Sequence, residues 1–285
     1  MDSHDENPYD LLAIEADGSE RWAFGTGFSD PLEGIDAGVP AGLDPAALAR
    51  YCLALGDDAL IYSHRLTQWM TRMPELEEET ALANVALDLL GQARMLLSRA
   101  GGILGRTEDE LAFLRTEPEF RNVRLAERSD ADFADLMARL FVFSVWRLEL
   151  FEALTTAPDH LLAAITAKGV KELAYHRDYA AGWVVRLGDG TELSHRRMQR
   201  ALDEVWPLVD ELFRPDAHAL AVASRAAFDA TLDTVLATAG LARPELAGLA
   251  GVGGRFGRDG VHTEAMGYAL AEMQSVAREY PGATW

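Results

Sequence analysis

The chain has 285 residues and a formal net charge of −20, with 46 acidic against 26 basic side chains. Nucleic-acid binding depends on Lys and Arg side chains that neutralise phosphates, so this balance argues against nucleic acid as a partner, and it argues in the same way against an anionic membrane surface. It also weighs against this chain holding a highly anionic ligand alone, although a local basic patch or a basic partner could do so.

The composition predicts a cytoplasmic, helical protein with a large core. Hydrophobic residues make up 49% of the chain, and the length suits one large helical domain. The single Cys52 excludes an intramolecular disulfide and a thiolate metal cluster. The first ten residues, MDSHDENPYD, lack the features of a secretory signal, and no run of about 18 uncharged apolar residues predicts a membrane span.

The first 43 residues differ from the rest. Gly, Pro and acidic residues recur there, and the apolar residues follow no sustained helix or strand periodicity, which favours a disordered extension. Apolar side chains such as Leu11, Trp22 and Phe28 fit equally an arm that docks on the body or on a partner. The predicted domains are therefore an N-terminal extension over 1–43 and a helical bundle over 44–285.

Hydrophobic periodicity and capping signals predict an all-α fold. Asp44-Pro45 is a helix start, Thr107 and Glu110 form a capping box, and Pro207 should kink its helix. Residues 118–129 read as irregular, and 248–260 as a Gly-rich basic loop. Helices are predicted over about 44–70, 74–101, 107–115, 132–156, 158–188, 194–213, 216–223, 225–239 and 262–280. The four longest predict a four-helix bundle, with the others packed outside.

Two of these long helices carry polar residues like those of a di-metal bundle, which needs a Glu from two helices and Glu-x-x-His from the other two. Asn84, Asp88 and Gln92 recur every four residues and share one helix face. Either this stripe faces solvent, as in any amphipathic helix, or it is buried and hydrogen-bonded in the core. It contains no His, and an amide is a weak ligand for iron or manganese.

The helix over 158–188 keeps a His but has the wrong spacing. Glu172 and His176 are four residues apart, and the position three before His176 is a Leu. We favour a surface ladder of Lys168, Glu172 and His176, each link worth tenths of a kcal/mol, over a ligand role.

The other two long helices offer scattered carboxylates. Asp57 or Asp58 could stand where the bundle's single carboxylate belongs. Glu149 is expected to pair with Arg147 or Arg139, or to face solvent. A di-metal site wants about four carboxylates and two His, so the spacing predicts no metal site.

The C-terminal region carries weaker signals. The loop over 248–260 lacks the context of a phosphate-binding loop and is expected to be a flexible connection whose Arg255 and Arg258 contact a partner. His262 and Glu264 are expected to serve helix capping and first-turn charge.

Several segments together resemble one known family. The chain is similar over about 44–285 to the C subunits of bacterial ring-1,2-phenylacetyl-CoA epoxidase. The resemblance rests on GDDALIYSHRLTQW, MPELEEETALANVALDLLGQAR, KELAYHRDYAAGWVVRLGDGTELSHRRMQRALDEVW and RDGVHTEAMGYALAEMQSVAREYPGATW, in that order. Residues 1–43 lie outside it.

The resemblance implies a ferritin-like fold and a place in a multicomponent monooxygenase of aerobic phenylacetate catabolism. It implies that the di-iron site lies in a sister A subunit, which also binds the thioester, while a reductase subunit supplies electrons from NADPH. The C subunit is then a structural partner of the A subunit in a hetero-oligomer, with no catalytic residue and no cofactor of its own.

Carried onto this sequence, the degenerate metal site comprises Asp57 or Asp58, Asp88 with Gln92, Glu149, and Glu172 with His176. A buried Asp88 without a metal needs a donor, which an Arg, a Lys or His176 should supply. Two alternatives stay open: a metalloprotein with an atypical di-metal site of its own, and a scaffold bundle unrelated to phenylacetate.

Overall fold

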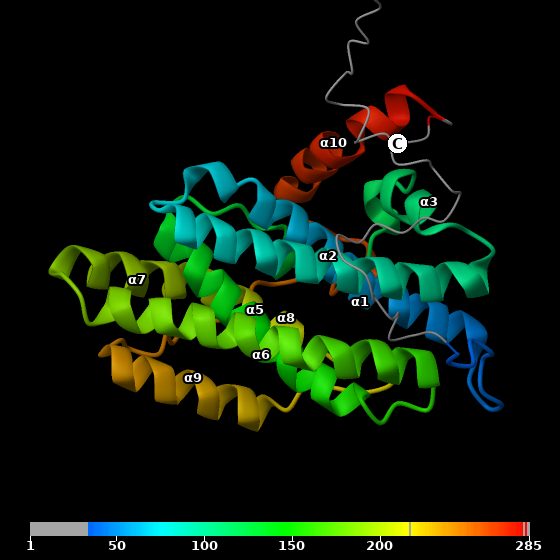
Figure 1. Cartoon of the computed structure of the whole chain (residues 1–285). Helices are drawn as coiled ribbons and strands as arrows, with labels where there is room; N and C mark the ends of the chain where they lie inside the picture. The colour runs from blue at the N-terminus through cyan, green and yellow to red at the C-terminus, as the bar shows by residue number, and fades with distance from the viewer. Residues whose placement is uncertain (1–33, 217, 282, 284–285) are drawn as a thin grey trace, which may run out of the picture. The chain divides into compact units, whose positions relative to one another are not determined.

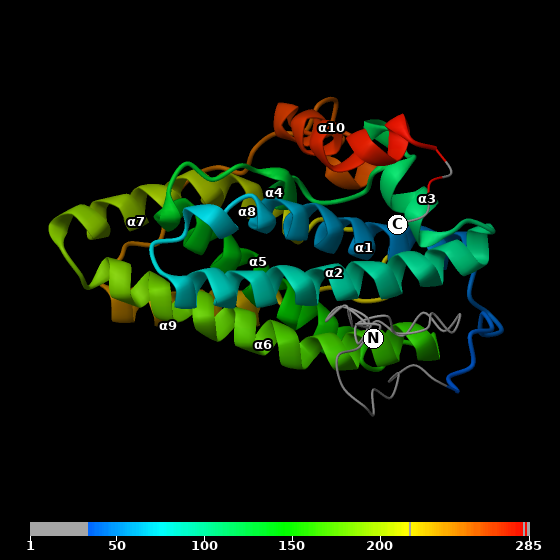
Figure 2. The ribbon, with the colours of Figure 1, turned by 45° about the horizontal axis from the view of Figure 1, so that its top comes forward.

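The computed structural model describes residues 34–216, 218–281 and 283, and every regular element among them is a helix. The four longest form the bundle core, in which α1 packs against α2, α5 against α6, and α2 against α6 (Figures 1 and 2). Their bounds are α1 Pro45–Thr67, α2 Leu76–Leu104, α5 Phe133–Leu154 and α6 His160–Gly188. The predicted all-α four-helix bundle is confirmed.

The shorter helices pack around this core. Helices α7 and α9 lie against α5 and α6, and α10 packs on α1 and α3 (Figure 1). Their bounds are α3 Glu108–Phe113, α4 Arg124–Glu127, α7 Glu192–Val205, α8 Val209–Leu212, α9 Arg225–Ala239 and α10 Glu264–Glu279, with 3-10 turns η2 Met70–Arg72, η3 Glu117–Glu119, η4 Trp206–Leu208 and η5 Gly257–Asp259.

Helix α5 is the centre of the hydrophobic core. Nearly all of its side chains are buried, including Phe141, Trp146 and Phe151. A helix that is apolar on all sides must be enclosed by other elements, and here α6, α7 and α9 pack against it. The polar residues Arg139, Ser144 and Arg147 of α5 are therefore buried inside the protein.

Local capping signals located several helix ends correctly. Asp44 accepts a hydrogen bond from the Ala46 amide at 3.0 Å, and Thr107 and Glu110 form the predicted capping box. Pro207 was predicted to kink one helix over 194–213; it lies in η4, which divides this stretch into α7 and α8.

Three local predictions were wrong. Helix α2 continues through Gly101 and ends at Leu104, because Gly105, with φ of 69°, supplies the left-handed C-cap. Residues 216 and 218–223 form no helix, and the Ala221 carbonyl there accepts from the Tyr51 hydroxyl at 3.1 Å. The stretch 118–129, predicted irregular, contains the short helix α4.

The segment before α1 is described only from Gly34 onward. Residues 34–43 belong to the same compact unit as the bundle, and Arg99 of α2 donates to the carbonyls of Ala37 and Gly38 at 2.5 and 3.3 Å. The prediction of an extension over 1–43 falls largely outside the described residues. Among the described helices, none combines the length and hydrophobicity needed to span a bilayer.

Candidate functional site

A buried guanidinium occupies the middle of the four-helix core. Arg147 of α5 is fully buried, its Nε donates to the Oε1 of Gln92 in α2 at 3.0 Å, and its Nη2 donates to the Leu55 carbonyl in α1 at 3.1 Å. Its guanidinium also lies 4.3 Å from the ring centroid of Phe151. One cation thus connects α1, α2 and α5.

The side-chain amide of Gln92 connects Arg147 to α6 through a second hydrogen bond. Its Oε1 accepts from Arg147 while its Nε2 donates to the Oε2 of Glu172 at 2.9 Å. The other oxygen of Glu172 lies 3.6 Å from the Nζ of Lys168, a half-exposed side chain. Hydrogen bonds therefore connect Arg147 in the core to Glu172, and an ion pair continues from Glu172 to Lys168 at the surface. Through the Leu55 carbonyl, the network also reaches α1, so it touches all four core helices.

Asp58 is the buried carboxylate nearest to Arg147. Its Oδ2 lies 3.8 Å from the Nη1 of Arg147 and accepts from the Nη2 of Arg258 at 2.7 Å, and its Oδ1 accepts from the Val123 amide at 2.8 Å. Burial raises the pKa of Asp58, and the two arginines oppose that rise. Burial lowers the pKa of Arg147 to about 10, with Asp58 opposing it, so the guanidinium stays charged near neutral pH.

Asp57 points to a different partner. Its carboxylate forms a bidentate ion pair with Arg115, whose Nη1 donates to Oδ2 at 2.9 Å, and the Arg121 amide donates to the same oxygen at 2.8 Å. Asp57 is fully buried, so this pair fixes the chain around η3 onto α1. Adjacent aspartates thus serve two separate ion pairs.

Asp88 has the donor that the sequence predicted. The Nε2 of His176 lies 3.0 Å from the Oδ2 of Asp88, joining α2 to α6. The polar stripe on α2 matches neither alternative along its whole length, since Asn84 is exposed, Asp88 is half-buried and Gln92 is fully buried. The predicted ladder holds only for Lys168 and Glu172, because His176 turns to Asp88 instead.

Glu149 stands apart from this network. Within the described chain its carboxylate has no hydrogen-bond partner, and burial together with Glu152 raises its pKa. The expected pairing was wrong, because Arg147 bonds to Gln92 and Arg139 donates to Asp130 at 2.8 Å. Residues two apart on a helix point in nearly opposite directions, so Arg147 faces inward where Glu149 does not.

These side chains do not fit a di-iron centre. The described residues hold no group of three or more His, Cys, Asp or Glu side chains that could bind a metal ion. The amide oxygen of Gln92 already accepts from Arg147, and the Asp58 carboxylate is bonded to Arg258. A permanent guanidinium charge among the remaining carboxylates repels a divalent cation.

A comparison with protein-family models matches residues 40–285 to the family described as phenylacetic acid catabolic protein. The chain belongs to this family. It is also 42% identical over 250 residues to the C subunit of 1,2-phenylacetyl-CoA epoxidase from Escherichia coli (strain K12), covering 84% of this chain and 99% of that relative. The expected resemblance and ferritin-like bundle are confirmed, and a role in phenylacetate catabolism is supported, so the alternative of a scaffold unrelated to phenylacetate was wrong.

The Gly-rich loop over 248–260 is attached to the core rather than being a flexible connection. Arg258 donates to Asp58 and to the carbonyls of Ala54 and Arg121 at 2.9 and 2.7 Å, so its guanidinium ties the loop to α1 and to the segment after η3. The predicted partner contact of Arg258 stays a prediction. Arg255 donates to the Asp259 carbonyl at 2.9 Å within the same loop.

His262 was also assigned the wrong role. It is buried before α10, with its Nδ1 2.9 Å from the Oε2 of Glu127, and the Thr263 amide donates to the other oxygen of Glu127 at 2.6 Å. Glu127, on α4, therefore caps α10 from a distant part of the chain. No local pattern in the sequence pointed to Glu127, whereas Arg147 was visible as one of two cations, with Arg139, in a mostly apolar helix.

Proposed function

We propose that this chain is a structural, non-catalytic subunit of the multicomponent di-iron monooxygenase that epoxidises the ring of phenylacetyl-CoA in aerobic phenylacetate catabolism. In this proposal it acts in the cytoplasm and pairs with and supports the catalytic A subunit. The relative from Escherichia coli is named as a subunit of such an epoxidase, and nearly the whole of that relative is matched here.

The network around Arg147 is the observation that carries the proposal. A di-metal bundle places carboxylates and imidazoles from all four helices around two cations. Here Arg147 supplies the cation from within the chain, and Gln92 links it to Glu172. Such an arrangement neutralises the buried acids without a metal, so these helices pack as a bundle while oxygen chemistry takes place elsewhere.

The cofactors follow from the same proposal. The di-iron site and the thioester site belong to the A subunit, and NADPH reaches the complex through the reductase subunit. The net charge of −20 supports placing the anionic coenzyme A moiety on a partner. None of Asp57, Asp58, Asp88, Glu149, Glu172 and His176 is given a catalytic or metal-binding role.

Exposed apolar side chains on the core helices support a partner surface. Leu87 on α2 and Tyr175 on α6 are 63% and 51% exposed, on the two helices joined by the Asp88–His176 pair. Aromatic and apolar side chains of this kind are typical of the centre of protein interfaces.

The test is metal analysis combined with co-purification. The full-length chain is produced alone and together with the homologous A subunit, and iron is counted per chain in each preparation. We expect far less than one iron in the chain alone, no oxygenase activity without the A subunit, and a stable complex of the two. Two irons per chain with the optical band of a bridged di-iron centre would establish the atypical metalloprotein instead. A monodisperse monomer in the presence of the A subunit would refute the pairing.

A further inference from the structure

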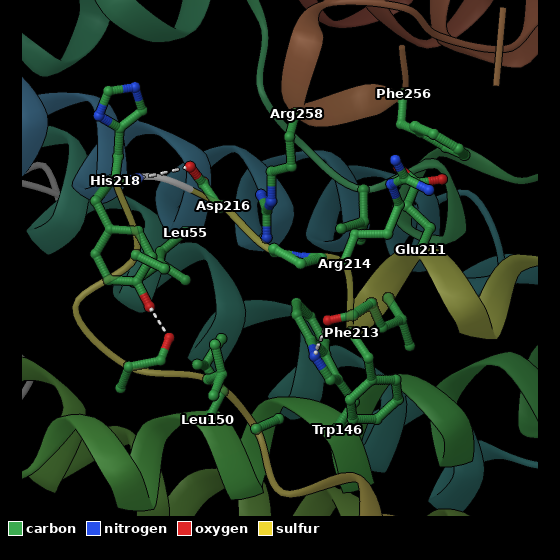
Figure 3. A pocket seen from close by; sticks show the side chains of 18 of the residues that line it. Leu55, Trp146, Leu150, Glu211, Phe213, Arg214, Asp216, His218, Phe256 and Arg258 are labelled. Carbon is green, nitrogen blue, oxygen red and sulfur yellow. Dashed lines mark hydrogen bonds between the residues drawn. The ribbon is translucent and has the colours of Figure 1, made fainter. Parts of the chain in front are cut away.

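A cavity of about 530 Å³ lies outside the polar core, between α1, α5, the segment 211–225 and the Gly-rich loop (Figure 3). Its volume is within the range of small-molecule sites. The proposed function uses none of its exposed side chains, so its chemistry can be considered independently.

One side of the cavity is apolar and rigid. Leu55 of α1 and Trp146 and Leu150 of α5 belong to the buried core and line it. The indole N–H of Trp146 donates to the Leu212 carbonyl at 3.0 Å, and the hydroxyl of Tyr51 donates to the Ala221 carbonyl at 3.1 Å. These aromatic side chains therefore offer their apolar faces to a ligand, and their polar atoms are already satisfied.

The opposite side is cationic. In Figure 3, Arg214 and Arg258 lie above Trp146 and Leu150. Arg214 is exposed, and its guanidinium is 3.7 Å from the ring centroid of Phe256. Among the described residues the guanidinium has no hydrogen-bond partner, so its N–H groups are available to a ligand.

The other arginines of the lining are more fully engaged. Arg258 is bound to Asp58, and Arg225 donates to Asp229 at 3.1 Å. The Nη2 of Arg50 donates to the Arg258 carbonyl at 3.0 Å, and the remaining N–H groups of its guanidinium have no such bond within the described part of the chain. Arg50 therefore adds positive charge and further hydrogen-bond donors to the cavity. Arg214 remains as the guanidinium with all of its donors unused.

Of the three carboxylates that line the cavity, Glu211 is paired with Arg124, and the other two limit how much negative charge the cavity accepts. Asp216 accepts from the His218 amide at 2.9 Å, and Asp259 accepts from the Phe256 amide at 3.1 Å, and both line the cavity. A ligand with one negative charge can use Arg214, whereas a polyanion such as a nucleotide would meet these two acids as well. A planar carboxylate also matches the fork of a guanidinium.

We propose that this cavity binds an aromatic carboxylate, with its ring against Trp146 and Leu150 and its carboxylate on Arg214. The stacking of Arg214 on Phe256 holds the guanidinium in place, so less freedom is lost when the ligand binds. The cavity borders the network around Arg147 at Leu55 and Arg258, but Arg214, Trp146 and Leu150 have no hydrogen bond to that network, and the proposal does not depend on the proposed function.

The first test uses three probes on the full-length chain, measured by calorimetry at low salt. Phenylacetate has both a ring and a carboxylate, 2-phenylethanol has the ring without the charge, and acetate has the charge without the ring. We expect saturable binding of phenylacetate, binding of 2-phenylethanol weaker by roughly tenfold or more, and no measurable binding of acetate. Equal affinity for phenylacetate and 2-phenylethanol, or no saturable binding of phenylacetate at millimolar concentration, overturns the proposal.

The second test compares two exposed arginines, each with its guanidinium near an aromatic ring. Arg214→Gln should weaken phenylacetate binding about tenfold and leave 2-phenylethanol unchanged. Arg186→Gln is the matched control, because Arg186 is also exposed and lies 5.1 Å from the ring centroid of Trp183, but on α6. Ala219→Trp, which fills the cavity, should abolish binding of both aromatic probes. The proposal fails if Arg214→Gln and Arg186→Gln act alike, or if Ala219→Trp leaves binding intact.

Discussion

Gly169 of α6 lies directly against the ring of Phe151 in α5. A Cβ at position 169 would come within 2.7 Å of two ring atoms and 3.4 Å from the amide nitrogen of Gln92. The same ring is stacked on the guanidinium of Arg147, with 4.3 Å between its centroid and Cζ. The absence of a side chain at this one position therefore lets α5 and α6 close over the buried cation.

Gly169→Ala should destabilise the bundle. The added methyl group must displace the Phe151 ring from its present position, and overpacking of this kind costs about 1–3 kcal/mol of unfolding free energy. Gly182→Ala, in the same helix, has open space around the new methyl and should stabilise by about 0.5–1 kcal/mol. Urea unfolding followed by circular dichroism measures both, and the same sign for the two variants would contradict this account.

Arg147→Met should be among the most destabilising single changes. It leaves the Gln92 amide oxygen and the Leu55 carbonyl without their buried donor and weakens the pairing of Asp58. We expect a loss of about 3–5 kcal/mol, the usual consequence of removing one member of a buried charged network. The control is Arg196→Met, whose exposed pair with Glu192 should matter by less than about 0.5 kcal/mol. Similar unfolding midpoints for the two variants would show that the network contributes little.

The sequence predicted the helices well where the signal is local. Asp44 before a proline and the Thr107–Glu110 box define helix starts through bonds that span three residues or fewer, so these starts could be predicted. The helix predicted over 216–223 failed because its apolar side chains line a cavity and its Ala221 carbonyl binds Tyr51, which tertiary packing alone decides.

The sequence identified several residues of the polar core, but it did not show which of them pair with one another. Asp58 was identified as an interruption of an apolar run and Gln92 and Glu172 from helix spacing, while His176 was one of three donors considered for Asp88. Arg258 is 200 positions from Asp58, so no periodicity could connect the two. Side-chain pairing between distant segments depends on how the helices are rotated, which the sequence pattern leaves undetermined.

His262 should make stability fall as the pH rises above neutrality. Burial by itself lowers the pKa of His262, but the hydrogen bond and charge of Glu127, with smaller contributions from the Phe120 carbonyl and Glu117, outweigh burial and raise that pKa above its ordinary value. The charged form thus favours folding. This stability is fully present below the unfolded pKa of about 6.5 and is lost as the pH rises through the raised folded value.

The check on His262 is a series of urea unfolding experiments from pH 6 to alkaline pH, together with NMR titration of its ring. His262→Gln should remove the decline of stability over this window. His64 serves as a comparison, because burial lowers its pKa, so its contribution appears on the acid side of about 6.5 and has the opposite sign. A ring of His262 that titrates below its ordinary value would contradict the prediction.

Cys52 should be unreactive in the folded protein and thereby report unfolding. It is fully buried in α1, and burial, with a smaller contribution from Asp159, raises the pKa of its thiol to about 12. The thiolate is the nucleophile, so both the low thiolate fraction and the lack of access protect it from a disulfide reagent near pH 8. An aromatic disulfide reagent releases a coloured thiolate when it reacts with a cysteine. Because the chain has one cysteine, this colour reports the reaction of Cys52 alone. We expect labelling to begin only in the urea range where circular dichroism shows the loss of helix. Rapid stoichiometric labelling of the native protein would mean that the core around α1 opens far more readily than its packing implies.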